Sequence, residues 1–396
     1  MQTRSELEIY VHIPFCVRKC NYCDFLSFPS DENARNEYIS ALYNEIGLSG
    51  KRYEKFNVAH RSGEGLCVTS FFAGGGTPTV IGGKGLAELL RRVKEAFVFS
   101  KDAEITAECN PGTVTEKDLI LLRNAGFNRL SIGLQSAVEG ELKSLGRIHD
   151  FGRFKETYDA AVSAGFDNIN VDIMTAIPGQ STVSLAETIE KILHLDPRPE
   201  HISAYSLIIE PGTMFYDMNE RGELKLPSED TERLMHWQVI DTLEKNGYRL
   251  YELSNLALPG YECRHNTGYW TGKQYLGFGL GAASYFGDER FTNTRNMAEY
   301  LGFWGQPGIY QERPLEEKEV LSLEDKMSEF MFLGLRMTDG IDCDEFRIRF
   351  GLDIKDVYGA EIDKHTKEGL LLKEGKRLRL SRRGQDVANY VFADFV

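Results

Sequence analysis

The sequence predicts an α/β protein: a partial (β/α)6 barrel, followed by a C-terminal α+β region and a winged-helix-like module. Short β-branched runs alternate with amphipathic helical patterns from residue 7 to about residue 213. Strand–helix units in series imply parallel strands joined by right-handed crossovers. Six such units do not fill an eight-stranded barrel, and the alternation stops after residue 213, so we predict a barrel that stays open.

The predicted barrel strands are short apolar runs. They cover residues 8–13, 68–73, 103–108, 129–134, 168–173 and 201–207. Apolar residues at three- and four-residue spacing predict helices over 85–97, 116–126, 154–165 and 184–195. Gly126 and Gly165 end the second and third of these helices, where a left-handed residue is favoured. A polar insertion is expected at 50–66.

The second half of the chain follows a different pattern. A long helix (228–246) and a strand (248–254) precede an aromatic, glycine-rich stretch at 260–305. Helices near 323–337, 342–350 and 355–369 precede a basic hairpin pattern at 371–381, interpreted as a solvated wing, and a closing helix. We therefore predict a barrel at 1–213, a connecting α/β region at 214–312 and a winged-helix-like domain at 313–396.

Composition and charge restrict the functional classes. Of the 396 residues, 42% are hydrophobic and 27% charged, which is typical of a globular protein. The net charge of −14 argues against a broad nucleic-acid surface, and no apolar run of about 18 residues predicts a membrane span. Seven cysteines, without a recognisable secretion signal, favour a cytoplasmic protein whose thiolates bind metal.

Three cysteines form the strongest motif. Cys16, Cys20 and Cys23 follow the first predicted strand in a C-x3-C-x2-C spacing. Three thiolates on one loop can hold three irons of a [4Fe-4S] cluster and leave the fourth iron open. An open iron can bind S-adenosylmethionine (SAM), whose one-electron cleavage yields a 5′-deoxyadenosyl radical. The alternative is a structural zinc site whose fourth ligand is Cys67, Cys109 or Cys263.

With these cysteines the chain resembles the radical SAM superfamily, in the branch of the oxygen-independent coproporphyrinogen III dehydrogenases and the HemW heme chaperones. The resemblance runs from about Tyr10 to the C-terminus. It implies that the AGGGTPT segment (73–79) contacts SAM through Gly75, Gly76 and Thr77. It also implies cofactor contacts from Tyr10, Glu108, Gln135, Arg147, Asp172 and Ser206. Each could instead be a satisfied polar residue at a strand end, but their recurrence at successive strand ends indicates one pocket.

Two departures distinguish the chain from the dehydrogenases. Those enzymes have a further cysteine two residues after the third ligand, where this chain continues with Asp24 and Phe25. They also carry an N-terminal extension that helps to close the active site, whereas 15 residues precede Cys16 here. Radical decarboxylation needs an enclosed substrate, so the missing extension makes that reaction less expected here.

A second motif supports that interpretation. The segment RHNTGYW (264–270) contains the HNxxYW pattern that the resemblance associates with heme. His265 is the expected ligand of heme iron, and Tyr269 and Trp270 offer rings that can stack on a porphyrin. We expect an exposed loop here. Cys263 is an alternative ligand, and a purely structural role for His265 and Asn266 is the competing interpretation.

We therefore expect a heme chaperone that transfers heme to apo-hemoproteins, with a [4Fe-4S] cluster and SAM in a supporting role. An oxygen-independent coproporphyrinogen III dehydrogenase is the alternative, and a radical enzyme acting on heme itself is a third class. The resemblance leaves open three points: whether the recipients are respiratory and membrane-associated, whether the protein binds a membrane peripherally, and whether it is a homodimer.

Overall fold

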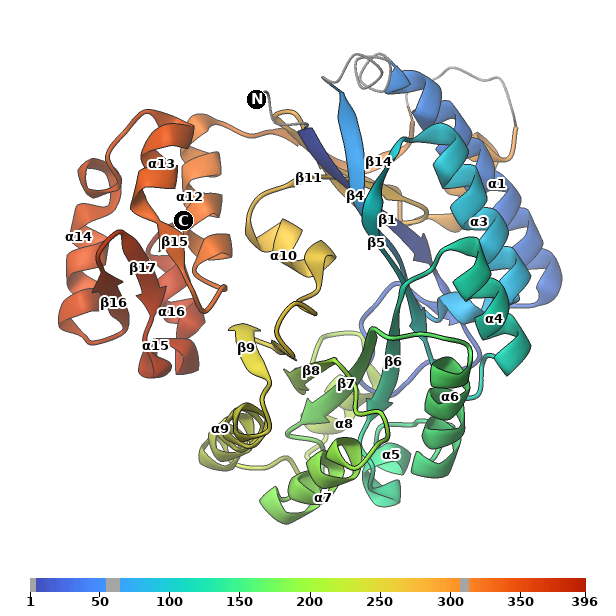
Figure 1. Ribbon diagram of the computed structural model, residues 1–396, viewed down its shortest axis with the longest axis horizontal. Helices are drawn as coiled ribbons and strands as arrows, with labels where there is room; N and C mark the ends of the chain where they lie inside the picture. Colours follow the sequence, from blue (N-terminus) through green and yellow to red (C-terminus); the bar gives the residue numbers. More distant parts are fainter. Residues whose placement is uncertain (1–4, 55–64, 307–312) are drawn as a thin grey trace.

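The computed structural model describes residues 5–54, 65–306 and 313–396 (Figure 1). Its centre is a 12-stranded sheet in the order β14-β13-β12-β11-β1-β4-β5-β6-β7-β8-β10-β9. Neighbouring strands from β1 to β8 in this order are parallel. They are β1 (Ser5–Ile13), β4 (Leu66–Gly75), β5 (Phe99–Cys109), β6 (Arg129–Gln135), β7 (Ile169–Thr175) and β8 (His201–Ser206). The predicted α/β class with six parallel strands is confirmed.

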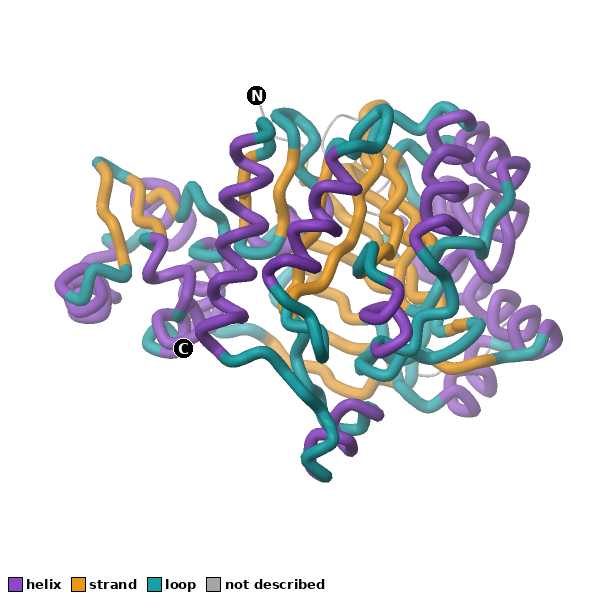
Figure 2. Tube along the Cα trace, turned by 90° about the horizontal axis from the view of Figure 1, so that it is seen from below, coloured by secondary structure: helices purple, strands orange, loops and turns teal. Residues whose placement is uncertain are grey.

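Helices cover the outer face of this curved sheet, as both ribbon and tube views show (Figures 1 and 2). They are α1 (Glu32–Arg52), α3 (Gly82–Ala96), α4 (Glu116–Ala125), α5 (Glu139–Ser144), α6 (Phe151–Ser163) and α7 (Thr182–Leu193). In α3 the buried positions include Leu86, Leu89, Leu90 and Val93, so the predicted apolar stripe packs on the sheet. Gly126 ends α4 with φ of 109°, a left-handed conformation that glycine adopts readily. The helices thus leave the inner face for other elements.

Short strands extend the sheet at both edges. At one edge, β11 (Gln274–Phe278) pairs in parallel with β1, and β12 (Ala283–Phe286), β13 (Glu289–Asn293) and β14 (Leu315–Val320) follow antiparallel. At the other, β10 (Asn255–Ala257) and β9 (Arg249–Glu252) add to β8. The main sheet therefore continues into 260–305 and beyond residue 312. The insertion expected at 50–66 begins inside α1, and its residues 55–64 lie outside the described ranges.

The C-terminal part has its own core. The helices α12 (Leu323–Gly334), α13 (Cys343–Phe350) and α14 (Ile354–Lys367) pack with a small sheet of β15 (Ile341–Asp342), β17 (Arg377–Leu380) and β16 (Leu371–Glu374), and α15 (Arg382–Asp386) and α16 (Ala388–Ala393) follow. Basic hairpin residues pair with acids, as in Lys376 with Asp344 and Arg379 with Glu374. Within the described ranges, no helix combines the length and apolar character that a membrane span needs.

Between this part and the barrel lies α10 (Arg264–Trp270), on the inner side of the sheet (Figure 1). The remaining helices of the connecting region are α8 (Met214–Glu220), α9 (Glu229–Lys245) and α11 (Met297–Trp304). This arrangement places the HNxxYW segment opposite the strands that carry the predicted cofactor residues.

Candidate functional site

The three predicted cluster cysteines lie on the loop that follows β1. Cys16 ends β2 (Phe15–Cys16), which pairs with β3 (Phe28–Pro29) and so holds the two ends of the loop together. All three thiols are free and half-buried. A polar group lies near each sulfur: the Thr77 hydroxyl is 3.6 Å from Cys16 Sγ, the Arg147 guanidinium is 3.6 Å from Cys20 Sγ, and the Ser27 hydroxyl is 4.0 Å from Cys23 Sγ. Such contacts stabilise thiolates, the form that binds iron.

The glycine turn after β4 closes on this loop. The Gly76 N–H donates to the Ile13 carbonyl at 2.9 Å, and the Thr77 N–H donates to the Phe15 carbonyl at 2.7 Å. A Cβ at Gly76 would lie 2.6 Å from the Phe15 oxygen and 3.0 Å from Cys16 Sγ. Only glycine fits here without displacing the loop, so the turn packs directly against the cysteine loop.

A structural zinc site on the three loop cysteines would need a fourth ligand from another part of the chain. Cys67, Cys109 and Cys263 are all buried. In the ranges that the structure describes, no three His, Cys, Asp or Glu side chains converge on one metal-ion position. A [4Fe-4S] cluster does not need its thiolates around one metal position, because each thiolate binds a separate iron. Three free thiols on one loop fit a [4Fe-4S] cluster, which when bound would supply the electron for SAM cleavage.

A cavity of about 1160 Å³ opens on the inner face of the sheet. It exceeds the roughly 300–1,000 Å³ of an ordinary ligand pocket, so it has room for more than one ligand. Its lining includes these predicted site residues: Tyr10, Cys23, Glu108, Gln135, Asp172, Ser206 and His265. Cys20, Thr77 and Arg147 line a separate, smaller pocket at the cysteine loop. The structure thus brings six of the ten predicted cofactor-binding residues and the HNxxYW segment around one space, whereas Gly75, Gly76, Thr77 and Arg147 lie outside its lining.

Two half-buried carboxyl groups, Glu108 and Asp172, line this cavity. Glu108 Oε2 accepts a hydrogen bond of 3.0 Å from the Gly75 N–H. Burial, reinforced by the nearby Asp172, raises the pKa of Glu108 to about 8, and burial also raises the pKa of Asp172. A cation bound beside them would stabilise their ionised forms. SAM carries both an ammonium and a sulfonium group, so the site suits it.

The other predicted residues have varied surroundings. Arg147 donates to Asn110 Oδ1 and to the Gly133 carbonyl, both at 2.7 Å, so it faces the cluster loop. Gln135 adopts φ of 70°, an unusual conformation for a residue with a side chain, at the end of β6. The Tyr10 hydroxyl lies 3.0 Å from His12 Nδ1, and Ser206 donates to Glu232.

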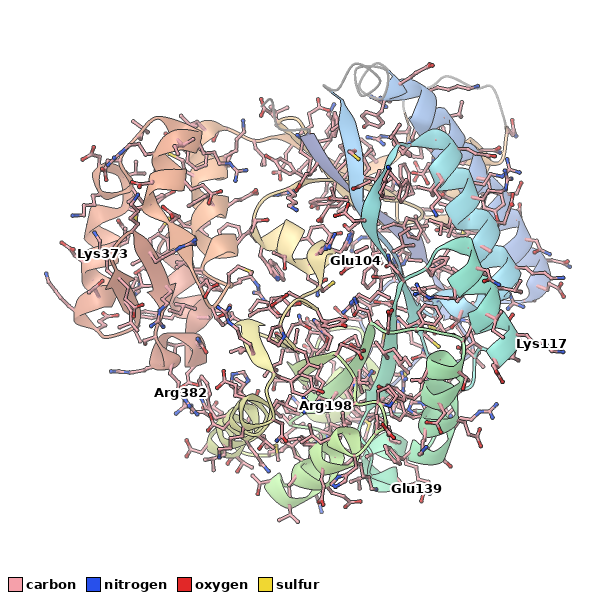
Figure 3. All side chains as sticks on the ribbon, in the orientation of Figure 1. Glu104, Lys117, Glu139, Arg198, Lys373 and Arg382 are labelled. Carbon is pink, nitrogen blue, oxygen red and sulfur yellow. The ribbon has the colours of Figure 1, made fainter. Side chains whose placement is uncertain are left out.

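The HNxxYW segment is a helix, and the expectation of an exposed loop is wrong. The Glu104 carboxylate accepts the backbone N–H groups of Arg264 at 3.1 Å and His265 at 3.2 Å, which satisfies the first turn of α10. Figure 3 labels Glu104 next to this helix. His265 is only 2% exposed. The physical reason for the difference is that polar groups of the sheet, not water, bind the polar residues of α10.

Both ring nitrogens of His265 have partners. Nδ1 lies 2.7 Å from the Ser70 hydroxyl, and Nε2 lies 3.1 Å from the Tyr269 hydroxyl. Burial, together with the nearby Arg129, lowers the pKa of His265 to about 3, so the ring is neutral at pH 7. Cys263 is a protonated thiol, since burial raises its pKa to about 12. His265 is therefore the better candidate ligand of the two, and its role stays a prediction.

Sequence reasoning missed three buried charged residues on the parallel strands of the barrel. Glu8, Glu104 and Arg129 lie in β1, β5 and β6, and all are buried. Parallel strands covered on both faces are normally continuous apolar runs, so a charged residue inside such a run is itself a signal. That signal was available in EIYVHI, AEITAE and RLSIGL.

Comparisons with known proteins agree with this geometry. Residues 10–192 match the radical SAM superfamily, and residues 321–387 match the HemN C-terminal domain. The chain is 34% identical over 393 residues to the heme chaperone HemW of Escherichia coli (strain K12), and 33% identical over 388 residues to that of Bacillus subtilis (strain 168). Each alignment covers 98% of both chains.

A solved structure shows the same fold. Coproporphyrinogen III oxidase (HemN) from Escherichia coli, described as a radical SAM enzyme, matches with a TM-score of 0.82 at 23% identity. The match covers 99% of this chain and 90% of that one. The relatives, the superfamily match and the cysteine loop together imply a [4Fe-4S] cluster and SAM as cofactors. This chain belongs to the HemW family within the radical SAM superfamily.

Proposed function

We propose that this protein is a heme chaperone that binds heme and transfers it to apo-hemoproteins, with the [4Fe-4S] cluster and SAM bound nearby. The main support is its similarity to relatives named heme chaperone HemW, at 33–34% identity over nearly the whole of both chains. The cavity of about 1160 Å³ adds a structural reason, because it adjoins both the cluster loop and the HNxxYW helix.

The cavity wall near α10 suits a flat, apolar ring with a central iron. The rings of Tyr269 and Tyr275 lie 4.7 Å apart and nearly perpendicular, and Trp270 and Tyr285 line the same space. Neutral His265 offers Nε2 once the Tyr269 hydroxyl moves away. Aromatic faces and an imidazole are the groups with which proteins commonly hold heme. HNxxYW is therefore proposed as the heme-binding segment, with His265 as the iron ligand.

The alternative function is the radical decarboxylation of coproporphyrinogen III. It rests on a fold and a cysteine motif shared with HemN, and a shared fold supports many functions. A homodimer, and peripheral contact with membranes that hold respiratory hemoproteins, are further proposals. Size-exclusion chromatography and co-sedimentation with vesicles test these two directly.

Heme titration of the anaerobically reconstituted protein tests the proposal. We expect one heme with a Soret band and a dissociation constant of about 1 μM or lower, equivalent to about −8 kcal/mol. His265→Ala should weaken or shift this band, whereas His194→Ala, at the exposed end of α7, should not. Transfer to an apo-hemoprotein should slow in His265→Ala only. Protoporphyrinogen formed from coproporphyrinogen III in the presence of SAM and reductant would overturn the proposal in favour of the dehydrogenase.

A further inference from the structure

Arg129, at the start of β6, is a buried cation that has no direct partner. It is 2% exposed and has the largest of the fully buried side chains. Its Nε is buried without a hydrogen-bond partner. In the part of the chain that the structure describes, the guanidinium has no hydrogen bond and no carboxylate oxygen within 4.0 Å. A guanidinium carries five N–H donors, and a buried donor without a partner, such as Nε here, destabilises the fold.

Arg147 shows that this state is not general for buried arginines of this protein. It donates to Asn110, to the Gly133 carbonyl and to Cys20 Sγ. The acids around Arg129 are bonded elsewhere. Glu104 accepts the first N–H groups of α10, and Asp172 accepts a bond of 2.7 Å from Asn170. Arg129 nevertheless stays protonated, since burial lowers its pKa but the nearby carboxylates of Glu104 and Asp172 raise it.

The position of Arg129 connects it to the large cavity. Arg129 lines that space together with His265, and the two interact electrostatically. The exposed part of the same lining contains the apolar side chains of Phe25 (63% exposed) and Ile208 (67% exposed), beside the charged Lys19, Asp24 and Arg295. The cavity therefore has a cation on its inner wall, and its rim is partly apolar and partly charged. A ligand that carries both carboxylates and hydrocarbon matches this lining.

We propose that Arg129 binds a carboxylate of the ligand that occupies this cavity, and that for bound heme this carboxylate is a propionate. The identity of the ligand rests on the proposed function. The methionyl carboxylate of SAM is the second possible source of the same chemistry. We favour the propionate because Arg129 shares the cavity wall with His265, the proposed iron ligand, and begins β6, whereas the cysteine loop follows the end of the parallel strand β1. An arginine can bind a carboxylate through two parallel N–H···O bonds, which would satisfy the donors that the protein leaves free.

Heme and heme dimethyl ester, whose propionates carry no charge, distinguish these possibilities. The wild type should bind heme at least tenfold more tightly than the ester. Arg129→Met should weaken heme binding at least tenfold and leave ester binding unchanged. Arg129→Lys keeps the charge and should lose less heme affinity than Arg129→Met. Arg198→Met is a surface control, since Arg198 donates to the Asn246 carbonyl, and it should bind heme and the ester like the wild type. Iron content and far-UV circular dichroism verify that each variant is folded and holds its cluster.

SAM binding, measured by equilibrium dialysis on the same variants, assigns the source. A tenfold loss for SAM with heme unaffected would support a carboxylate site but overturn the propionate assignment. The inference would be overturned if Arg129→Met lost equal affinity for heme and its ester, or if the folded variant lost no affinity for either heme or SAM. If Arg129→Met does not fold, Arg129→Lys carries the test: weaker binding of heme but not of its ester would support the inference, and equal affinity changes for both would overturn it. Failure of the wild type to bind heme would instead refute the proposed function, and the SAM measurement would still test Arg129.

Discussion

Replacing Gly268 by alanine tests how closely α10 packs on the sheet. A Cβ at Gly268 would lie 1.9 Å from Glu8 Oε1 and 2.2 Å from Glu8 Cδ, where real contacts are essentially never below 3.0 Å. Glu8 is fully buried, so its side chain cannot move into solvent. The substitution must therefore displace either the helix or β1.

The magnitude follows from two opposing effects. Alanine inside a helix is better than glycine by about 0.5–1 kcal/mol, whereas overpacking a buried site costs about 1–3 kcal/mol. We expect Gly268→Ala to lower the free energy of unfolding by roughly 0.5–2 kcal/mol. Gly302, inside α11, has nothing within 4 Å of its Cβ position. Gly302→Ala should therefore stabilise the protein by about 0.5–1 kcal/mol, so the matched pair differs in sign.

Urea unfolding of the reconstituted proteins measures this difference, and heme titration reports on α10 itself. Gly268→Ala should also weaken heme binding, because the displaced helix carries His265. Truncating the opposing side chain should relieve the clash, so Glu8→Ala combined with Gly268→Ala should recover about 1 kcal/mol or more in a double-mutant cycle. A Gly268→Ala variant as stable as wild type, or a cycle with no coupling, would refute the packing described for α10.

Single replacement of Cys16, Cys20 or Cys23 by alanine should abolish a cluster of about four irons, whereas Cys343→Ala, on α13, should keep it, as iron and sulfide analysis will show. Gly76→Ala should lower iron content as well as SAM binding, because its Cβ would lie 3.0 Å from Cys16 Sγ; a full iron complement would contradict this. Burial raises the pKa of Glu8 from 4.5 to about 9, so the folded state holds a proton that the unfolded state releases above about pH 4.5. The free energy of unfolding should fall as the pH rises from about 5 to 9, and Glu8→Gln should make this fall smaller. Urea unfolding at several pH values measures it, and an equal fall in both proteins would argue against the role of Glu8.

The parallel strands were predictable because their signal is local. A strand buried on both faces is a short apolar run, and the run predicted at 129–134 lies within β6 (Arg129–Gln135). The cysteine loop was predictable for the same reason, since its ligands carry their spacing within one short segment. The sheet extension was not. In that extension Leu7 lies opposite Gln274, and β12 has only 4 residues, too few to show a period.

The helix α10 was misjudged for a different reason. Hydrophobic periodicity finds a helix when one of its faces is apolar and the opposite face meets water. Here the surface that receives the helix is itself polar: Ser70 bonds the His265 ring, and Glu104 bonds its backbone. A rule that equates polarity with exposure therefore places such a segment outside the core. Yet this burial lowers the pKa of His265 to about 3 and keeps the imidazole in the neutral form that binds iron. The buried polar contacts that make this helix hard to predict from sequence thus belong to the same environment that keeps His265 neutral.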